Sequence, residues 1–450
     1  MIGALHLPEI ALGRAWVEQG FHEMRLSIRP CVLGGLVAGV IGVTGPAFAA
    51  TQLISLGSTN NLGNGVSGHA ALGAGAAFTT FSSTARNLVP GDTNGAEDCF
   101  YRNLTTGAFE LLSQSTSGVR GNAKSLKPVP SVDGSVVTFQ SSASNLDGSD
   151  TNGKLDVFVR NRTTDTTRRV SETSSGGQAN GDSTYPQISP NGRYVVFAST
   201  ASNLAASDGN TRSDIYRHDL QTGRTEHVSV STSGGASNGN SLYPAISGDG
   251  RYVAFQSSST NLVAGDTNGQ TDVFLRDMQT GRTELVSVSS SGAQGAGTSH
   301  YPDLSDDGRY VIFISVARNL SSGDTNNFND LFVRDRTTNT TTRLTRGVGN
   351  TQINGNTISP EISGNGQVIV FGSEASNLVA GDGNRVADVF TVNRQTGVIR
   401  MMSVDAGNNE GPQRSFQQHI SQDGRHVVFS TVSRLQASDT NGAQDVYLGN

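Results

Sequence analysis

The sequence predicts an all-β protein, a seven-bladed β-propeller made of four-stranded blades. Three observations support this prediction: a composition rich in glycine and poor in charge, a segment that recurs seven times at a spacing of 57 or 58 residues, and a segment near residue 54 that completes the last copy. Long repeats that each hold several strands are typical of propellers, because one blade cannot bury its apolar faces alone.

The composition indicates short strands joined by tight turns. Glycine supplies 55 of the 450 residues, whereas charged residues make up 16% and aromatic residues 6%. Glycine is favoured where the chain must turn sharply. The formal net charge of −6 argues against a nucleic-acid partner, which normally requires a basic surface.

The N-terminal segment has the features of a secretory signal peptide. Arg25 and Arg29 precede an apolar run over residues 32–43, and the small-residue pattern Ala47-Phe48-Ala49 follows it. This order predicts cleavage after Ala49, with Met24 as the true start. The apolar run is shorter than the ~20 residues that a membrane span needs.

We therefore expect residues 1–49 to be a leader and residues 50–450 to be one propeller domain. The mature protein is expected to be exported, either periplasmic or extracellular, with no membrane span and as a monomer. Cys31 lies in the leader, so Cys99 is the one thiol of the folded part. Other copies of the repeat carry Val, Ile or Leu at this position, which predicts a small buried hydrophobe rather than a nucleophile.

Each copy of the repeat is expected to hold four strands. In the fourth copy, Tyr243–Ser247 and Asp249–Phe255 read as the first two strands, and Val273–Arg276 and Thr283–Val288 as the last two. All four are rich in β-branched and aromatic residues and are separated by Gly, Asp and Asn. Tight hairpins are predicted between the first two strands at the pairs Asn191-Gly192, Asp249-Gly250, Asp307-Gly308, Asn365-Gly366 and Asp423-Gly424.

The two ends of the repeat array indicate a closed ring. The seventh copy stops at Asn450, within its third strand, and lacks a fourth. The segment Leu53–Leu56 matches the fourth-strand segment Leu285–Val288, so the N-terminal strand is expected to complete the last blade. Closure in this way leaves no open sheet edge at the seam.

The repeat resembles the WD-like propeller repeat of TolB-type periplasmic proteins. The residues that carry the resemblance run from Tyr243 to Ser257, in the pattern Tyr-Pro-x-Ile-Ser-x-Asp-Gly-Arg-Tyr-Val-x-Phe-x-Ser, followed by a segment whose consensus over the copies is Asp-Val-Phe-Val-Arg-Asp and which reads Asp-Val-Phe-Leu-Arg-Asp at residues 272–277. The resemblance implies the propeller fold and leaves the function open, because such repeats occur in translocation scaffolds, in gating domains of oligopeptidases and in lyases. The sequence shows neither the N-terminal α/β domain of TolB nor a hydrolase domain.

A second motif, Asp-x-Asn-x-x-x-Asp, lies between the second and third strands of every copy. Its seven sets are Asp92, Asn94 and Asp98; Asp150, Asn152 and Asp156; Asp208, Asn210 and Asp214; Asp266, Asn268 and Asp272; Asp324, Asn326 and Asp330; Asp382, Asn384 and Asp388; and Asp439, Asn441 and Asp445. Hard oxygen donors at alternating positions are typical of Ca²⁺ loops, and affinities of ~10⁻⁴–10⁻³ M are typical of extracellular sites. We therefore predict that these loops bind Ca²⁺.

The alternative interpretation of the same motif is a turn without metal. Asp and Asn side chains cap loops by bonding to nearby backbone groups, and the loops lack the bidentate Glu of an EF-hand. A related Asn precedes six of the loops, at positions 87, 145, 203, 261, 319 and 377, and is read as a turn residue.

The expected function is a binding or scaffold module. The loops that carry the motif and the Ser- and Gly-rich loops between blades are expected on one face, which would bind a protein or a glycan. No catalytic or organic-cofactor motif is present. The alternatives are a lyase-like enzyme acting on polysaccharide, for which His69, His300 and His419 are the histidines nearest a central channel, and a metal-free platform for protein interactions.

Overall fold

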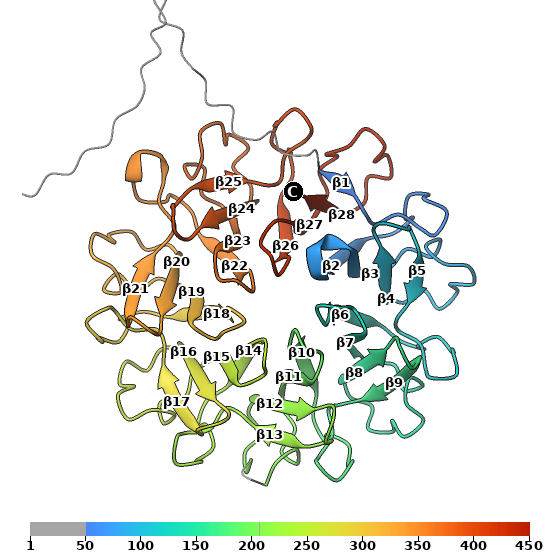
Figure 1. The fold of residues 1–450 in the computed structure, drawn as a ribbon, viewed down its shortest axis with the longest axis horizontal. Helices are drawn as coiled ribbons and strands as arrows, with labels where there is room; N and C mark the ends of the chain where they lie inside the picture. The colour runs from blue at the N-terminus through green and yellow to red at the C-terminus, as the bar shows by residue number, and fades with distance from the viewer. Residues whose placement is uncertain (1–50, 207) are drawn as a thin grey trace, which may run out of the picture. The chain divides into compact units, whose positions relative to one another are not determined.

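The computed structural model describes residues 51–206 and 208–450, and the predicted leader lies outside these residues. In the described part, 28 strands form seven antiparallel four-stranded sheets arranged as blades around a central axis (Figure 1). The predicted seven-bladed propeller is confirmed. No helix in this part of the chain is long and apolar enough to cross a membrane.

The strands of a blade are named a to d from the centre outward. The a strands are β2 Ser67–Leu72, β6 Ser125–Pro130, β10 Ser183–Ile188, β14 Ser241–Ile246, β18 Ser299–Leu304, β22 Thr357–Ile362 and β26 Ser415–Ile420. The b strands are β3 Phe78–Ser83, β7 Val136–Ser141, β11 Tyr194–Ser199, β15 Tyr252–Ser257, β19 Tyr310–Ser315, β23 Val368–Ser373 and β27 Val427–Thr431.

The c strands are β4 Asp98–Asn103, β8 Asp156–Asn161, β12 Asp214–Asp219, β16 Asp272–Asp277, β20 Asp330–Asp335, β24 Asp388–Asn393 and β28 Asp445–Gly449. The d strands are β5 Phe109–Leu111, β9 Thr166–Arg169, β13 Thr225–His227, β17 Arg282–Leu285, β21 Thr340–Arg343, β25 Ile399–Met401 and β1 Gln52–Leu53. Two short 3₁₀ helices, η1 Ala74–Ala76 and η2 Val348–Asn350, complete the described elements.

The hydrophobic core is divided among the interfaces between blades. Each of the seven buried clusters joins two neighbouring blades, as Phe78, Cys99 and Tyr101 of blade 1 do with Val137 and Phe139 of blade 2. Every blade also pairs one aromatic residue of strand b with one of strand c, with ring centroids 5.7–6.2 Å apart. Cys99 is fully buried, as its place in the repeat predicts.

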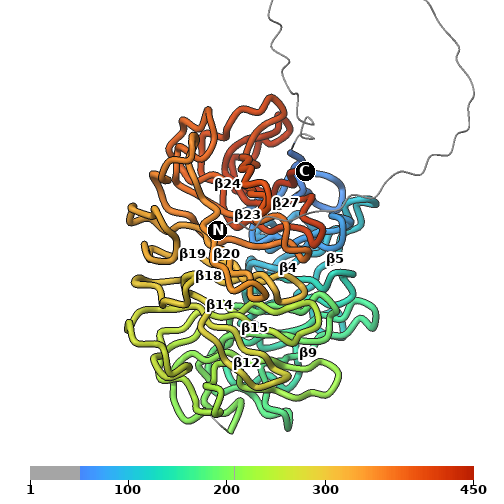
Figure 2. The backbone as a smooth tube through the Cα atoms, turned by 60° about the vertical axis from the view of Figure 1, so that its left-hand side comes forward, coloured from blue at the N-terminus to red at the C-terminus, as the bar shows by residue number. Residues whose placement is uncertain are grey.

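The N-terminal strand closes the ring, as predicted. Gln52 and Leu53 of β1 pair with Leu448 and Tyr447 of β28, and β1 lies beside the C-terminal strands in Figures 1 and 2. Ser55 Oγ donates to Asp445 Oδ1 at 2.6 Å, just as Ser287 Oγ donates to Asp272 Oδ1 at 2.5 Å. The register deduced from matching the two segments is therefore correct.

The strand boundaries differ from those predicted in two respects. Strand d of the fourth copy ends at Leu285, because Ser287 turns back to bind Asp272 and to accept the Val273 N–H. In the first copy, residues that replace the Asp-Gly turn pair form η1, in which Gly75 has a φ of 53°. The tight turns elsewhere are as predicted, with φ of 77° at Gly250.

Candidate functional site

The Asp-x-Asn-x-x-x-Asp loops are held together by their own side chains. In every blade the last Asp, which is fully buried, accepts a bond of 2.5–2.7 Å from a hydroxyl that follows strand d, or that follows β1 in blade 7. In every blade the Asn Oδ1 accepts the N–H of the second residue after it. In six blades the Asn amide also donates to the last Asp, as Asn268 does to Asp272 at 2.9 Å.

The structure therefore brings the three predicted residues of each loop together, in the geometry of a bonded turn. The separate Asn of positions 87 to 377 ties its loop to the preceding connection between blades, through residues 23 and 25 positions earlier in the chain, and does not close a local turn. Asn87, for example, accepts the Asn64 N–H and donates to the Leu62 carbonyl. The loop motif and the connections between blades lie on one face, since Asn94 donates both to Asp98 and to the Gly121 carbonyl.

In six of the seven loops the first Asp has a side-chain partner, which changes from blade to blade. The partners are Arg120 for Asp92, Arg169 for Asp150, Tyr216 for Asp208, Gln294 for Asp266, Arg343 for Asp324 and Tyr447 for Asp439. A guanidinium or a hydroxyl therefore already meets the carboxylate in five blades, and an amide meets it in a sixth.

Blade 6 lacks such a partner. Asp382, Asp388 and Glu410 place one carboxylate oxygen each within 4.8 Å of the others, and Asp382 Oδ1 is a buried oxygen with no hydrogen-bond partner among the described residues. Burial, together with the charges of the other two carboxylates, raises the pKa of Asp382 to about 6. It is the one group of three or more His, Cys, Asp or Glu in residues 51–206 and 208–450 that is arranged closely enough to hold a metal ion.

The central channel is a second candidate site, which the a strands of all seven blades line. Its cavity has a volume of about 340 Å³. In each a strand, the third residue is bulged and has a left-handed backbone with φ between 43° and 54°. These residues, named here the mouth ring, are His69, Lys127, Tyr185, Tyr243, Tyr301, Ser359 and Gln417.

All seven blades share the bulge, whereas the side chain at the bulge differs among the blades. Proline follows the mouth-ring residue in five blades, which suits a bulge because proline has no N–H to pair. Left-handed backbone in a non-glycine residue costs of the order of 1–3 kcal/mol and persists where the surrounding structure holds it. The mouth ring lies near the start of the a strands, on the side of the channel nearer the loop face.

Aromatic rings form an arc in the mouth ring. The Tyr185 and Tyr243 ring centroids are 4.4 Å apart, and those of Tyr243 and Tyr301 are 4.6 Å apart. Lys127 Nζ lies 3.9 Å from the Tyr185 ring centroid, and burial lowers the pKa of Lys127 to about 8. Burial, with the charge of Lys127, lowers the pKa of His69 to about 4, so this imidazole is neutral at pH 7.

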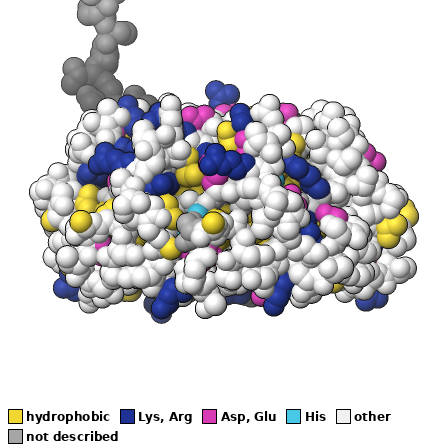
Figure 3. All heavy atoms as spheres, turned by 90° about the horizontal axis from the view of Figure 1, so that it is seen from below, with side chains coloured by type: hydrophobic (Ala, Val, Ile, Leu, Met, Phe, Trp, Pro, Cys, Tyr) yellow, Lys and Arg dark blue, Asp and Glu magenta, His cyan; other side chains and the backbone are white. Residues whose placement is uncertain are grey.

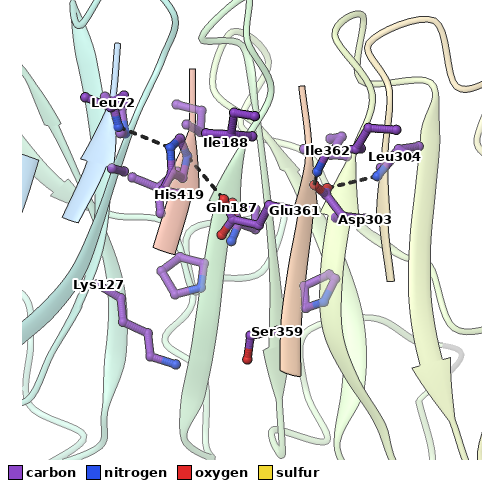
Figure 4. Close-up of a pocket in the computed structure, with 18 of the residues that line it drawn as sticks. Leu72, Lys127, Gln187, Ile188, Asp303, Leu304, Ser359, Glu361, Ile362 and His419 are labelled. Atoms are coloured by element: carbon purple, nitrogen blue, oxygen red, sulfur yellow. Dashed lines mark hydrogen bonds and ion pairs between the residues drawn. The ribbon is translucent and has the colours of Figure 1, made fainter. Parts of the chain in front are cut away.

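Deeper in the channel, three consecutive blades present titratable side chains at the fifth position of strand a. These residues, named here the inner trio, are Asp303, Glu361 and His419 (Figure 4). Asp303 accepts the N–H groups of Leu304 and Ile362, and His419 Nδ1 accepts the N–H of Leu72 at 3.2 Å.

Burial governs the protonation of the inner trio. It raises the pKa of Asp303 to about 7 and raises that of Glu361 well above its usual range, with the charge of Asp303 adding to the second effect. It lowers the pKa of His419 to about 4. Because neutral His419 accepts a bond at Nδ1, its proton is on Nε2, which lies 3.9 Å from Glu361 Oε2.

Two of the three histidines that the sequence places near a channel line it. His69 and His419 are lining residues, whereas His300 packs beside Tyr301 with ring centroids 6.3 Å apart and is not among the lining residues. Sequence reasoning missed Asp303 and Glu361. The signal was present, because the equivalent residues in the first four copies are Ala71, Val129, Gln187 and Ala245.

Comparisons with known proteins agree with the fold. No protein-family model and no curated protein matches the sequence. An oligogalacturonate lyase solved in complex with manganese is 13% identical, with a TM-score of 0.51 over 90% of this chain and 96% of that one. The propeller domain of the Trilobed protease from Pyrococcus furiosus is 9% identical, with a TM-score of 0.51 over 85% and 95% of the two chains.

A putative TolB from Agrobacterium tumefaciens is also among the similar structures. It is 15% identical, with a TM-score of 0.43 over 78% of this chain and 96% of that one. At these identities the likenesses to the lyase and the protease domain show the propeller fold alone.

Proposed function

We propose that this propeller is a binding module whose ligand enters the central channel from the loop face. The observation that carries the proposal is the mouth ring, in which a strained bulge common to all blades presents a different set of side chains to one cavity. The bulge alone requires only a residue that tolerates a left-handed backbone, whereas three tyrosines in succession provide the kind of aromatic surface on which ligands pack.

A tryptophan reporter in the mouth ring tests this proposal. The described residues contain no tryptophan, since the single Trp of the sequence is Trp16. Ser359→Trp places an indole where three other blades carry tyrosine. We expect saturable quenching with at least one of four probes at millimolar concentration: an oligogalacturonate, a gluco-oligosaccharide, trialanine and benzyl alcohol. If neither these four probes nor their cationic counterpart benzylammonium changes the fluorescence, the channel is not a ligand site.

A polysaccharide lyase is the second candidate function, favoured by the presence of His69 and His419 in the channel wall. Incubation with oligogalacturonate would then yield an unsaturated product that absorbs in the ultraviolet. His419→Ala should abolish the product, whereas the control His300→Ala should not, because His300 is not among the lining residues. Absence of product with the unmodified protein argues against the lyase.

Calcium binding is a further part of the proposal, and blade 6 is the loop best suited to it. Its three carboxylates are hard oxygen donors, and the buried Asp382 Oδ1 has no hydrogen-bond partner among the described residues. In the other blades the first Asp already meets an Arg, a Tyr or a Gln. Burial and the repulsion from Asp388 and Glu410 raise the pKa of Asp382, and a bound ion would offset that repulsion.

Thermal unfolding with and without Ca²⁺ tests the calcium proposal. A ligand at 100 times its dissociation constant stabilises the native state by about 2.7 kcal/mol. We expect Ca²⁺ to raise the Tm of the unmodified protein and of the control with Asp266→Asn and Asp272→Asn, but not of the variant with Asp382→Asn and Asp388→Asn. An unchanged Tm on chelation would favour the metal-free platform for protein interactions.

Export is also proposed, on the basis of the leader motif. Mass spectrometry of the mature protein should find an N-terminus at Ala50. Intact Met1 or Met24 on the exported protein would contradict cleavage after Ala49.

A further inference from the structure

We propose that the inner trio of the central channel binds an organic cation, a primary ammonium or a guanidinium group. This inference rests on the proposed role of the channel as a ligand site, and it names the chemical class of the ligand. Four kinds of observation support it: the placement of the two carboxyls, their hydrogen bonds, their charge balance and the tyrosine arc above them.

The placement is specific to two neighbouring blades. Asp303 in β18 and Glu361 in β22 occupy the same position of adjacent a strands, so both carboxyls line the same side of the cavity. In Figure 4 they lie at one level of the channel with His419, whereas Lys127 and Ser359 lie at the next level. The equivalent residues of blades 1 to 4 carry no charge.

The hydrogen bonds explain why each of these positions needs an acceptor, but they do not explain why two of the acceptors are carboxyls. Asp303, Glu361 and His419 each accept the N–H of the sixth residue of the next a strand, which is Ile362, Ile420 and Leu72 respectively. A neutral amide such as Gln could serve the same purpose. Glu361 Oε2 lies 3.9 Å from the His419 ring nitrogen, which is beyond hydrogen-bond distance.

At this level the described residues supply no cation to compensate the charge that the two carboxyls acquire when they ionise. The charges that act on the two carboxyls within the described residues are those of Asp303 and Asp306, and none is cationic. His419 is neutral, and Gln422 reaches Asp306 with its amide. A ligand cation would compensate this charge, since opposite charges within about 4–6 Å favour the ionised carboxylate.

The mouth ring already holds an ammonium group against an aromatic face. Lys127 Nζ lies over the Tyr185 ring, which leaves the rings of Tyr243 and Tyr301 on the side of the acidic blades. An ammonium over such a face is attracted by the negative charge density of the ring. The Lys127 charge opposes a second cation, but Lys127 lies at the other level of the channel and three blades away from Asp303, so the repulsion is weakened by distance.

A matched pair of ligands tests the inference. Benzylammonium and benzyl alcohol share a ring and differ in charge, so both can be titrated into the Ser359→Trp protein. We expect benzylammonium to bind about ten-fold more tightly, because a hydrogen bond to a charged group contributes about 1.5–3 kcal/mol. Equal affinity for the two probes would overturn the inference and leave the channel as a ligand site. If neither probe nor any of the other proposed ligands binds, both proposals fail.

Two variants and the pH dependence of binding test whether the carboxyls of the inner trio bind the cation. Glu361→Gln keeps an acceptor for the Ile420 N–H and should reduce benzylammonium affinity about ten-fold, whereas Glu374→Gln, which removes an exposed carboxylate outside the channel wall, should not. Affinity should rise with pH as the carboxyls ionise. The other titratable lining groups are His69, Lys127, Tyr185, Tyr243, Tyr301, Asp306 and His419. An affinity that is independent of pH and unchanged in Glu361→Gln contradicts the proposed site, even if the variant is less stable.

Discussion

At the scale of single residues, each mouth-ring position has the same strained backbone but a side chain with different contacts. Ser359 is the simplest member, because its side chain is exposed and its hydroxyl makes no hydrogen bond to another described residue, while its φ is 43°. Tyr243, by contrast, has the same backbone but packs between two other rings. Ser359 is therefore the position at which the cost of the backbone can be measured alone.

We predict that Ser359→Val destabilises the protein by about 1–2 kcal/mol, because β-branched residues are outliers at positive φ. Ser359→Asn should be close to neutral, since Asn tolerates this backbone. Urea unfolding of the two variants measures the difference. Equal stability of the Val and Asn variants would show that the bulge relaxes when its residue changes.

Asp303 predicts a pH dependence with a definite sign. Its folded pKa of about 7 lies above that of an unfolded Asp, so the folded state binds the extra proton between these values. This contribution to stability is complete below about pH 4 and is lost as the pH rises through about 7. Asp303→Asn should therefore gain Tm relative to the unmodified protein on going from about pH 5 to about pH 8. At each pH, subtracting the Tm of the unmodified protein from that of Asp303→Asn cancels the contribution of groups that both proteins share. A difference that stays constant from about pH 5 to about pH 8 would contradict the raised pKa of Asp303.

At the scale of elements, the repeat allowed the strands of the blades to be predicted, but it did not reveal the residues that line the channel. Strand order, hairpin turns and the pairing of β1 followed from seven aligned copies, because each copy reports the same local constraints. The bulge of the a strand was not predicted, since Tyr followed by Pro reads as an ordinary strand until its φ is known. The inner trio was missed because aligning the copies emphasises the residues that they share, whereas Asp303, Glu361 and His419 stand at a position where the copies differ.

The loop partners illustrate the same limit. All seven loops share Asp, Asn and Asp, so the sequence predicts one chemistry for all of them. The structure shows that Arg120 and Arg169, from different positions of their copies, reach the first Asp of their loops in blades 1 and 2. Such contacts depend on the fold, because the partners are 28 and 19 residues away along the chain.

Strand β1 carries the third prediction. A chain that begins at Ser58 lacks β1 and the Ser55 hydroxyl, which exposes the edge of β28 and leaves Asp445 without its partner. We expect a large fall in Tm for the whole domain relative to a chain that begins at Thr51. Circular dichroism at a β-sheet band follows the transition. A truncated chain with the Tm of the control would contradict the closure of the ring by β1.

At the scale of the whole molecule, stability depends on an unbroken ring of interfaces. Seven hydrophobic clusters join the seven blades in pairs, and the cluster between blades 7 and 1 contains Ile54, Phe81 and Val428. A linear repeat array has two free ends, whereas in this ring every blade has two neighbours. Figure 3 shows that charged side chains of both signs line the upper and lower margins of the ring, with hydrophobic side chains scattered between them.

The ring also predicts that the position of the seam is interchangeable. Asn450 matches Asp277 and Thr51 matches Thr283, so the segment Met278–Arg282 is what a linker between the two ends must replace. A circular permutant that joins Asn450 to Thr51 through Met-Gln-Thr-Gly-Arg, and that opens between Gly281 and Arg282, moves the seam from blade 7 to blade 4. The opening lies in an exposed hairpin, where breaks are tolerated.

We expect this permutant to fold with a Tm within about 5 °C of the linear chain, because it keeps all seven interfaces and every strand pair. The matched control opens at the same site without the linker, as two co-expressed fragments, and should be less stable because the two pieces must associate. Differential scanning calorimetry compares the three proteins. A permutant that fails to fold while the linear chain folds would mean that blade 7 is not equivalent to blade 4, and that its two-residue outer strand depends on contacts that only the natural order of the chain provides.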